Sequence, residues 1–167
     1  MQKRLARTMD RKILDGAPVD PTRSALMARV KAKDSKPEMA VRRCTHALGY
    51  RYSLHRRNLP GTPDLVLPRL RKAIFVHGCF WHRHHGCSRA TSPKTRATFW
   101  AAKFVDNVSR DARAQEALRA VGWDVLVIWE CETFNEQMLR ARLKRFLAAR
   151  KRQTTNPRGP RRRSTSG

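Results

Sequence analysis

The sequence predicts one α/β domain of three layers, built around a small mixed sheet. Segments of helical and extended periodicity follow one another in the order helix, strands, long helix, strand, helix. The chain has 167 residues, of which 40 % are hydrophobic. This length is sufficient for one domain with a hydrophobic core, but it is too short for two such domains.

The first predicted helix begins after Ser35, because Ser35 and Glu38 have the spacing of a capping box. Its apolar stripe continues through Cys44 to Leu48, and Gly49 ends the helix. Cys44 lies on this stripe without a metal-binding neighbour in the sequence, so we expect it to be a core residue.

Short apolar runs predict the strands, and turn-forming residues separate them. The predicted strands are residues 50–54, 64–67, 72–77 and 123–129. Helical periodicity predicts two further helices, over residues 95–121 and 135–149. Composition divides the chain into a basic flexible arm (1–20), the folded domain (21–149) and a basic disordered tail (150–167).

The strongest compositional signal is charge. Lys and Arg number 37 against 13 Asp and Glu, which leaves a net charge of +24. So basic a domain repels itself unless a polyanion neutralises it, and nucleic acid is the commonest such partner. No apolar run approaches the roughly 20 residues that span a bilayer, and the first residues lack the apolar region of a signal peptide. We therefore expect no membrane partner and a cytoplasmic, nucleoid-associated protein with reduced cysteines.

Residues 77–87 contain four His and two Cys, a density that packing alone does not explain. Cys79, Cys87 and either His84 or His85 can supply three metal ligands from one loop. Cys131, just beyond the strand 123–129, is the natural fourth ligand of a tetrahedral structural zinc site. The alternative is that the cysteines are small apolar core residues.

His82, between the two loop cysteines, remains free to act as a general acid or base. Asp64 begins a strand that neighbours the strand ending at His77, so we expect the Asp64 carboxylate to lie near His77 and His82. A carboxylate is the ligand that Mg²⁺ requires, and magnesium beside a histidine suffices for phosphodiester hydrolysis. Asp111 on the long helix can orient a histidine, and Glu38 can combine capping with catalysis.

Large aromatic side chains accompany this loop. Phe80, Trp81 and Trp100 are predicted to wedge between bases, although Trp100 also has the periodicity of a core residue. Trp123 and Trp129 are predicted to lie in the core of the sheet. Arg and Lys in four regions are expected to contact phosphates: residues 23–36, 51–57, 69–72 and 83–96.

These motifs together resemble the very short patch repair (Vsr) mismatch endonucleases. The matching stretches occur in the order of that family and cover about residues 22–149. They are Thr22–Ser24, Leu59–Asp64, Phe75–His82, Phe99–Trp100, Asn107–Asp111 and Gly122–Cys131. The third stretch, which reads FVHGCFWH, is long and specific.

The resemblance implies a restriction-endonuclease-like fold with a structural zinc and an active-site Mg²⁺. It implies that Asp64 binds magnesium and that His82 is the catalytic histidine. It implies supporting catalytic roles for Glu38, His77 and Asp111. The implied zinc ligands are Cys79, His84, Cys87 and Cys131. The implied DNA-binding residues are Phe80, Trp81, Trp100, Asn107 and Arg23. The implied reaction is a nick 5′ of the thymine in a T:G mismatch of double-stranded DNA, by a monomer with possible repair-protein partners.

Two departures accompany the resemblance. The loop after His82 is one residue longer than expected, which leaves the choice between His84 and His85 as zinc ligand open. Val76 replaces an expected Thr, a harmless change if only the backbone carbonyl is used. The alternative function is a zinc-stabilised nucleic-acid-binding module without catalysis, which would not need Asp64 and His82 together. No recognisable motif indicates which bases the chain prefers beside the mismatch, or whether it has a partner methyltransferase.

Overall fold

The computed structural model describes residues 33–93 and 95–149 of the chain. The predicted basic arm, Arg23 and the predicted basic tail lie outside the described residues. The predicted mixed sheet and its helices all fall within them.

The sheet has four strands in the order β1-β2-β3-β4. The bounds of these strands are Ser53–Leu54, Leu65–Leu67, Lys72–His77 and Asp124–Trp129. The first three strands pair antiparallel, and β3 pairs with β4 in parallel, from Lys72↔Asp124 to His77↔Trp129. The prediction of a mixed sheet is therefore confirmed.

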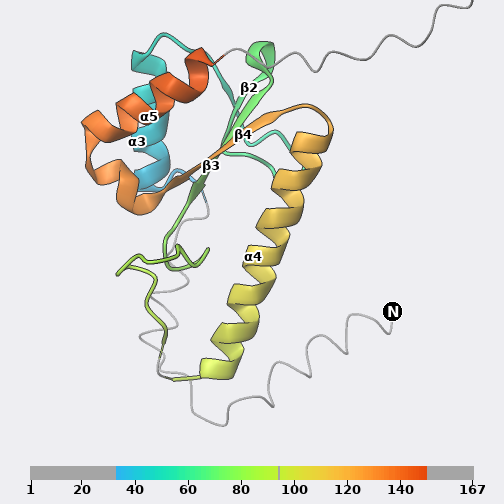
Figure 1. The fold of residues 1–167 in the computed structure, drawn as a ribbon, viewed down its shortest axis with the longest axis vertical. Coiled ribbons are helices and arrows are strands. Elements are labelled where there is room, and N and C mark those ends of the chain that lie inside the picture. Colours follow the sequence, from blue (N-terminus) through green and yellow to red (C-terminus); the bar gives the residue numbers. More distant parts are fainter. Residues whose placement is uncertain (1–32, 94, 150–167) are drawn as a thin grey trace, which may run out of the picture.

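Helices cover both faces of this sheet and give the predicted three layers (Figure 1). Helices α3 (Lys36–Ala47) and α5 (Glu136–Ala148) pack on one face, and α4 (Ala97–Ala120) lies on the other. Two short 3-10 helices, η1 (Pro68–Leu70) and η2 (Glu130–Phe134), follow β2 and β4. The larger core joins α3 and α5 to the sheet, and Cys44 belongs to it as predicted.

The first strand is shorter than the predicted segment 50–54. The backbone N–H of Tyr50 donates to the carbonyl of Thr45 at the end of α3, at 3.2 Å. The hydroxyl of Tyr52 donates to the carbonyl of Arg42, also at 3.2 Å. Both aromatic rings pack against the larger core. Because α3 holds these residues, only the next two remain to pair with β2.

The start of α3 agrees with the capping prediction in one half only. The Ser35 hydroxyl accepts from the backbone N–H of Glu38 at 3.4 Å, as a helix cap does. The Glu38 carboxylate, however, accepts from the N–H of Asp34 at 2.8 Å and not from that of Ser35. The reciprocal half of the capping box was wrong, because Glu38 is engaged by groups outside the helix.

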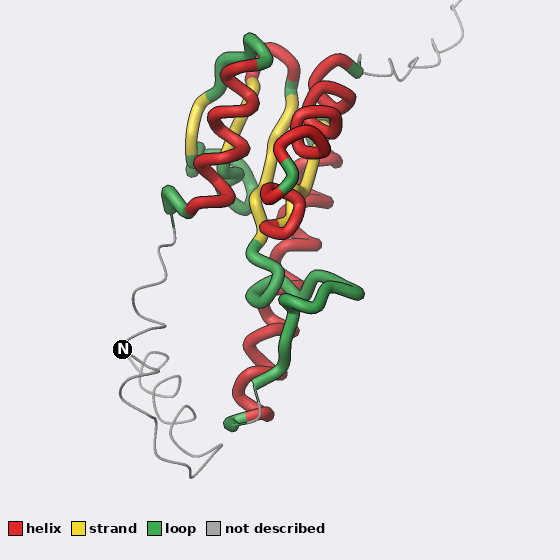
Figure 2. Tube along the Cα trace, turned by 90° about the vertical axis from the view of Figure 1, so that its left-hand side faces the viewer, coloured by secondary structure: helices red, strands yellow, loops and turns green. Residues whose placement is uncertain are grey.

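Helix α4 extends well beyond the sheet (Figures 1 and 2). Its 24 residues measure about 36 Å, whereas the six residues of β3 measure about 20 Å. Only Phe104, Asn107 and Leu118 of α4 are buried, and Val108 is 43 % exposed. The first half of α4 therefore forms an arm that faces the loop after β3. None of the described helices is long and apolar enough to cross a membrane.

A buried lysine links the sheet to the end of α5. Lys72, the first residue of β3, is only 2 % exposed. Its ammonium donates to the carbonyls of Phe146, Leu147 and Ala149, with the last at 2.6 Å. These carbonyls belong to the last turn of α5, where no further helical N–H is present to bind them. Lys72 thus caps α5 from the sheet.

We predict that Lys72→Met destabilises the domain by about 1–3 kcal/mol, because buried helix-terminal carbonyls lose their donor. Urea unfolding measures this change. Lys144→Met removes an exposed lysine of the same helix and is expected to change stability by less than about 0.5 kcal/mol. Equal unfolding midpoints for the two variants would contradict the capping role of Lys72.

Candidate active site and metal centre

The candidate site lies where β3 and β4 end together. Because these strands are parallel and in register up to His77↔Trp129, the segments that follow them leave the same edge of the sheet. The loop from Gly78 to Pro93 follows β3, and η2 with Cys131 follows β4. This arrangement brings residues almost fifty positions apart into one place.

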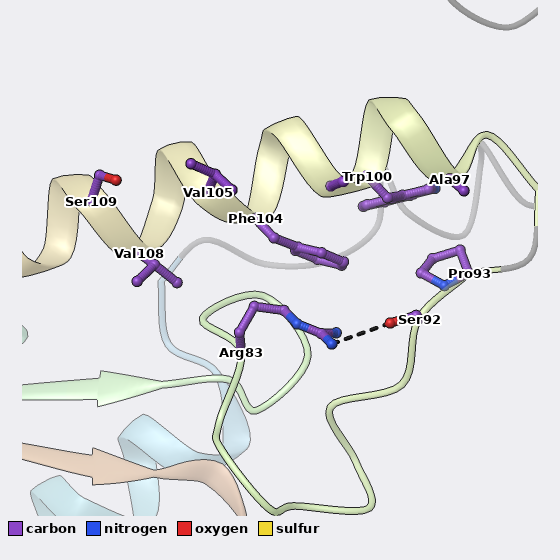
Figure 3. Close-up of a pocket in the computed structure, with 10 residues that line it drawn as sticks. Arg83, Ser92, Pro93, Ala97, Trp100, Phe104, Val105, Val108 and Ser109 are labelled. Atoms are coloured by element: carbon purple, nitrogen blue, oxygen red, sulfur yellow. Dashed lines mark hydrogen bonds between the residues drawn. The ribbon is translucent and has the colours of Figure 1, made fainter.

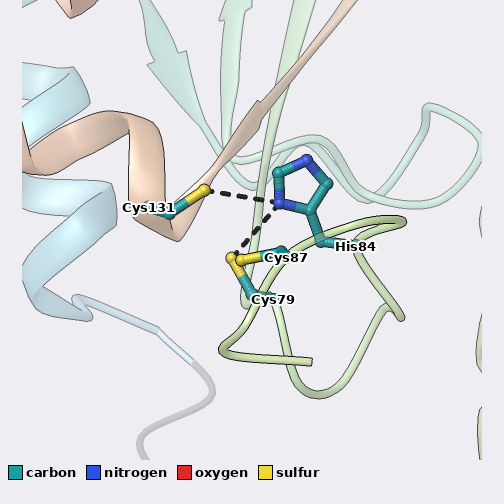
Figure 4. Close-up of side chains that lie close together, drawn as sticks. All are labelled: Cys79, His84, Cys87 and Cys131. Atoms are coloured by element: carbon teal, nitrogen blue, oxygen red, sulfur yellow. Dashed lines mark hydrogen bonds between the residues drawn. The ribbon is translucent and has the colours of Figure 1, made fainter. Parts of the chain in front are cut away.

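Three cysteines and one histidine converge at this edge (Figure 4). Ligand atoms of Cys79, His84, Cys87 and Cys131 all lie within 4.8 Å of one another. The Nδ1 atom of His84 lies 3.6 Å from Cys79 Sγ and 3.3 Å from Cys131 Sγ. A tetrahedral zinc ion separates nitrogen and sulfur ligands by about 3.5 Å. The cluster therefore has the spacing and chemistry of a zinc site, and it contains His84 and not His85.

The surroundings of this cluster favour a bound cation. Cys79 is fully buried, and burial beside the thiols of Cys131 and Cys87 raises the pKa of Cys79 to about 12. A thiolate forms there only if a positive charge compensates it. The His84 ring stacks on Trp129, with ring centroids 4.2 Å apart and an interplanar angle of 6°. Trp129, predicted as sheet core, is thus a half-buried support of this cluster.

A second cluster contains His77, His82 and Asp111. The Asp111 carboxylate contacts Nδ1 of His82, and the rings of His77 and His82 stack with centroids 4.0 Å apart. Burial and the neighbouring His82 lower the pKa of His77 to about 4, so His77 is neutral at neutral pH. A histidine whose Nδ1 faces a carboxylate has its other nitrogen available for proton transfer.

Asp64 contacts β3 one residue before His77. Its Oδ2 accepts from the backbone N–H of Val76 at 2.7 Å, and its side chain is 21 % exposed. Burial, together with the nearby charge of Glu38, raises the pKa of Asp64 to about 6. A desolvated carboxylate beside a second acid provides hard oxygen ligands and gains from a divalent cation.

Asp64 and His82 have different partners in the structure. Asp64 belongs to none of the groups of three close metal-competent residues in the described chain. It lies instead with Glu38 and His55, whereas His77 and His82 lie with Asp111. The two clusters meet at consecutive residues of β3, because Val76 anchors Asp64 and the next residue is His77.

Sequence reasoning missed two residues of this site, Arg42 and His55. Arg42 pairs with Glu38 four residues earlier on α3, a spacing that predicts an ion pair. Its guanidinium also contacts Asp34 at 2.6 Å and Nε2 of His55 at 3.0 Å. His55 follows β1 and carries no local motif, so only the fold could reveal its position.

The aromatic residues of the loop pack against the arm of α4. The Phe80 ring lies edge-on to the rings of Trp81, Trp100 and Phe104, at centroid distances of 5.2–5.5 Å. Asn107 is buried and donates to the carbonyl of Trp81 at 3.0 Å, so it holds the loop on the helix. Phe80, Trp81 and Trp100 are half-buried, which leaves part of each ring accessible.

Arg83 closes an apolar groove beside these rings (Figure 3). Its guanidinium lies 4.5 Å from the centroid of the Phe104 ring and donates to Thr91 and Ser92 at 2.9 and 3.2 Å. The loop is therefore held to α4 by a cation–π contact as well as by aromatic packing. Val105 and Val108 extend the groove along the exposed face of α4.

Comparison with known proteins gives a consistent set of matches. Residues 19–89 match the family described as DNA mismatch endonuclease Vsr. The chain is 49 % identical over 125 residues to the type II nicking enzyme V.XorIIP of Xanthomonas oryzae pv. oryzae, covering 75 % of this chain and 91 % of that relative. It is 37 % identical over 131 residues to the DNA mismatch endonuclease Vsr of Escherichia coli, covering 75 % and 83 %.

We predict that Asp64→Asn stabilises the domain at neutral pH when no divalent ion is added. In the folded state the pKa of Asp64 is raised from 3.8 to about 6. Protonated Asp64 therefore stabilises the fold below pH 3.8, and this stabilisation is lost as pH rises through 6. Ionised Asp64 therefore costs about 3 kcal/mol at pH 7. Urea unfolding at pH 4 and pH 7 measures the difference between variant and wild type.

The stabilisation by Asp64→Asn should shrink towards zero near pH 4, where the wild-type carboxyl is largely protonated. Asp106→Asn, at an exposed carboxylate of α4, serves as the control and should change stability little at either pH. An Asp64→Asn variant that is less stable than wild type at pH 7 would contradict the raised pKa.

Proposed function

The chain belongs to the Vsr family of DNA mismatch endonucleases, and we propose that it nicks one strand of double-stranded DNA 5′ of the mismatched thymine at a T:G pair. The nick would start very short patch repair. The relative from Xanthomonas oryzae pv. oryzae supports cleavage of one strand, because it is named a type II nicking enzyme. The observation that carries the proposal is the Asp111–His82 pair stacked on His77 at the end of β3.

In this proposal His82 is the general base. Asp111 holds the Nδ1–H of His82, which fixes the tautomer and leaves Nε2 as the proton acceptor for an attacking water. The stacked ring of His77 limits rotation of His82, and its low pKa prevents a second positive charge from forming beside the base. The same arrangement of base and orienting carboxylate occurs in hydrolases of unrelated fold.

Asp64 is the proposed magnesium ligand. Its Oδ1 lies 3.9 Å from the nearest His55 nitrogen, beyond hydrogen-bond distance, whereas both oxygens of Glu38 already accept hydrogen bonds. Magnesium bound there would neutralise charge that develops on the scissile phosphate. Glu38 then supports the site through Arg42 and His55. The scissile phosphate would lie at the end of β3, between the clusters of Asp64 and His82.

The cluster of Cys79, His84, Cys87 and Cys131 is the proposed zinc site. Zinc there would have a structural role, because four protein ligands fill a tetrahedral coordination sphere. It would fasten the loop that carries His82, Phe80 and Trp81 to the end of β4. The loop has no regular secondary structure of its own to hold these side chains.

Four of the proposed DNA-binding residues lie on the loop after β3 and on the first half of α4. Phe80, Trp81 and Trp100 would wedge beside the mismatch, and Asn107 would support them through the Trp81 carbonyl. Arg23 retains its proposed DNA-binding role but lies outside the described residues. The charge of +24 favours phosphate contacts throughout. A restriction-endonuclease-like fold, a monomeric state, association with the nucleoid and contacts to repair proteins complete the proposal.

We predict that the purified chain binds one zinc ion and that Cys131→Ser lowers its zinc content and its stability together. Loss of one of four ligands opens the coordination sphere, so chelators should remove the metal much faster. Atomic absorption and urea unfolding measure the two effects. Cys44→Ser, at a cysteine outside the cluster, should retain zinc, and wild-type protein without zinc would contradict the proposed centre.

We predict Mg²⁺-dependent nicking of a T:G-mismatched duplex and little cleavage of the matched duplex. Asp64→Ala should abolish nicking, and His82→Ala should slow it by about 10²–10⁴-fold, the range for loss of a general base. Asp111→Asn should also slow it, because the amide can hold His82 in the wrong tautomer. Gel analysis of a strand-labelled panel of mismatches and flanking sequences measures these rates.

His85→Ala is the matched control, because His85 is exposed and lies outside all three groups of close metal-competent residues in the described chain. It should nick at a rate close to that of wild type. Wild-type protein that binds the mismatched duplex but does not nick it would favour the alternative of a binding module without catalysis.

A further inference from the structure

His55 lies between the two acids of the candidate active site. It follows β1 and adopts a left-handed backbone conformation, with φ of 45°. Its N–H donates to the backbone carbonyl of Asp64 at 3.4 Å. A residue other than glycine adopts this conformation at a cost and usually where surrounding contacts require it. The contacts of the His55 ring provide such a requirement.

Both ring nitrogens of His55 face charged groups. Nε2 lies 3.1 Å from Oε1 of Glu38 and 3.0 Å from the guanidinium of Arg42. Nδ1 lies 3.9 Å from Oδ1 of Asp64. Oε1 of Glu38 already accepts from the guanidinium of Arg42, and an arginine has only donors, so Nε2 can accept from Arg42. In the tautomer that accepts this bond, the ring proton lies on Nδ1 and faces Asp64.

We propose that His55 is a positioning residue that orients the Asp64 carboxylate for the divalent ion. This inference rests on the proposed metal-dependent nicking. The N–H of Val76 holds Oδ2 of Asp64, and the Nδ1–H of His55 attracts Oδ1 from the other side. Because 3.9 Å is too long for a hydrogen bond, Oδ1 is oriented but remains available as a metal ligand.

Arg42 and Glu38 hold the His55 ring in place. Both are buried, with exposures of 7 % and 3 %, and they form an ion pair with each other. A buried ion pair often contributes little net stability, because desolvation offsets the attraction. Here the pair also contacts Nε2 of His55. The location of this buried ion pair is thus explained by a chain of contacts from Glu38 and Arg42 through His55 to Asp64.

The inference predicts opposite outcomes for two replacements of His55. His55→Leu removes both ring nitrogens, whereas His55→Gln retains an amide that can donate and accept. Removing a group that orients a metal ligand typically costs 10–100-fold in metal affinity. We expect His55→Leu to raise the Kd for Mn²⁺ at least 10-fold, and His55→Gln to stay within about threefold of wild type.

The full chain is titrated with Mn²⁺ in the absence of DNA, and free Mn²⁺ is followed by electron paramagnetic resonance. The Mg²⁺ dependence of nicking is measured in parallel. His55→Leu should require at least 10-fold more Mg²⁺ for half-maximal nicking. At saturating Mg²⁺ its rate should approach that of wild type, because the base His82 is unchanged.

Two further variants separate positioning from folding. His55→Gly relieves the left-handed backbone and should keep the domain folded in urea unfolding while losing Mn²⁺ affinity as His55→Leu does. His46→Leu makes the same change at an exposed histidine of α3 and should bind Mn²⁺ like wild type.

The inference is overturned if His55→Leu and His55→Gly bind Mn²⁺ as tightly as a wild-type chain that binds the ion and nicks DNA. It is also overturned if His55→Gln loses affinity to the same extent as His55→Leu. Equal Mn²⁺ binding by wild type and Asp64→Asn would instead show that the proposed metal site itself is wrong, and the role of His55 would fall with it.

Discussion

The parallel register of β3 and β4 is the constraint on which the candidate site depends. The strands pair residue by residue until His77 lies opposite Trp129, so the two chain segments leave the sheet side by side. Cys131 can then meet the cysteines of the loop, and Trp129 can support the ring of His84. A shift of this register by one residue would turn the side chains of β4 to the other face and would move Cys131 away from the cysteines of the loop.

Parallel pairing also requires a crossover, and α4 provides it. The helix is longer than the sheet needs, and the additional length reaches the loop after β3. Asp111 then contacts His82, Asn107 holds the Trp81 carbonyl, and Phe104 packs against Phe80. One helix therefore closes the topology of the sheet, orients the proposed base and supports the proposed aromatic wedge. The irregular loop is fixed by contacts with this helix and, in our proposal, by zinc.

The domain buries several ionisable groups, and burial disfavours the charged form of Lys72, Asp64 and His77 alike. Lys72 binds three helix-terminal carbonyls and stabilises the packing of α5 on the sheet. Asp64 and His77 have pKa values displaced in the direction that disfavours charge, which lowers stability at the pH where each would ionise. No packing requirement of the sheet explains that cost. It is the pattern expected where burial serves chemistry on a charged substrate.

The sequence alone determined the order of the elements and the bounds of β3 and α5 to within about a residue. It also identified the loop that carries the proposed zinc ligands. These features depend on local periodicity and composition. Only the tertiary structure selected His84 over His85, added His55 and Arg42, and placed Asp64 beside His55 and His82 beside Asp111. These outcomes depend on strand register, on which side of β3 each side chain lies, and on contacts between residues far apart in sequence. No local pattern encodes such geometry, which arises when the helices and the sheet pack together.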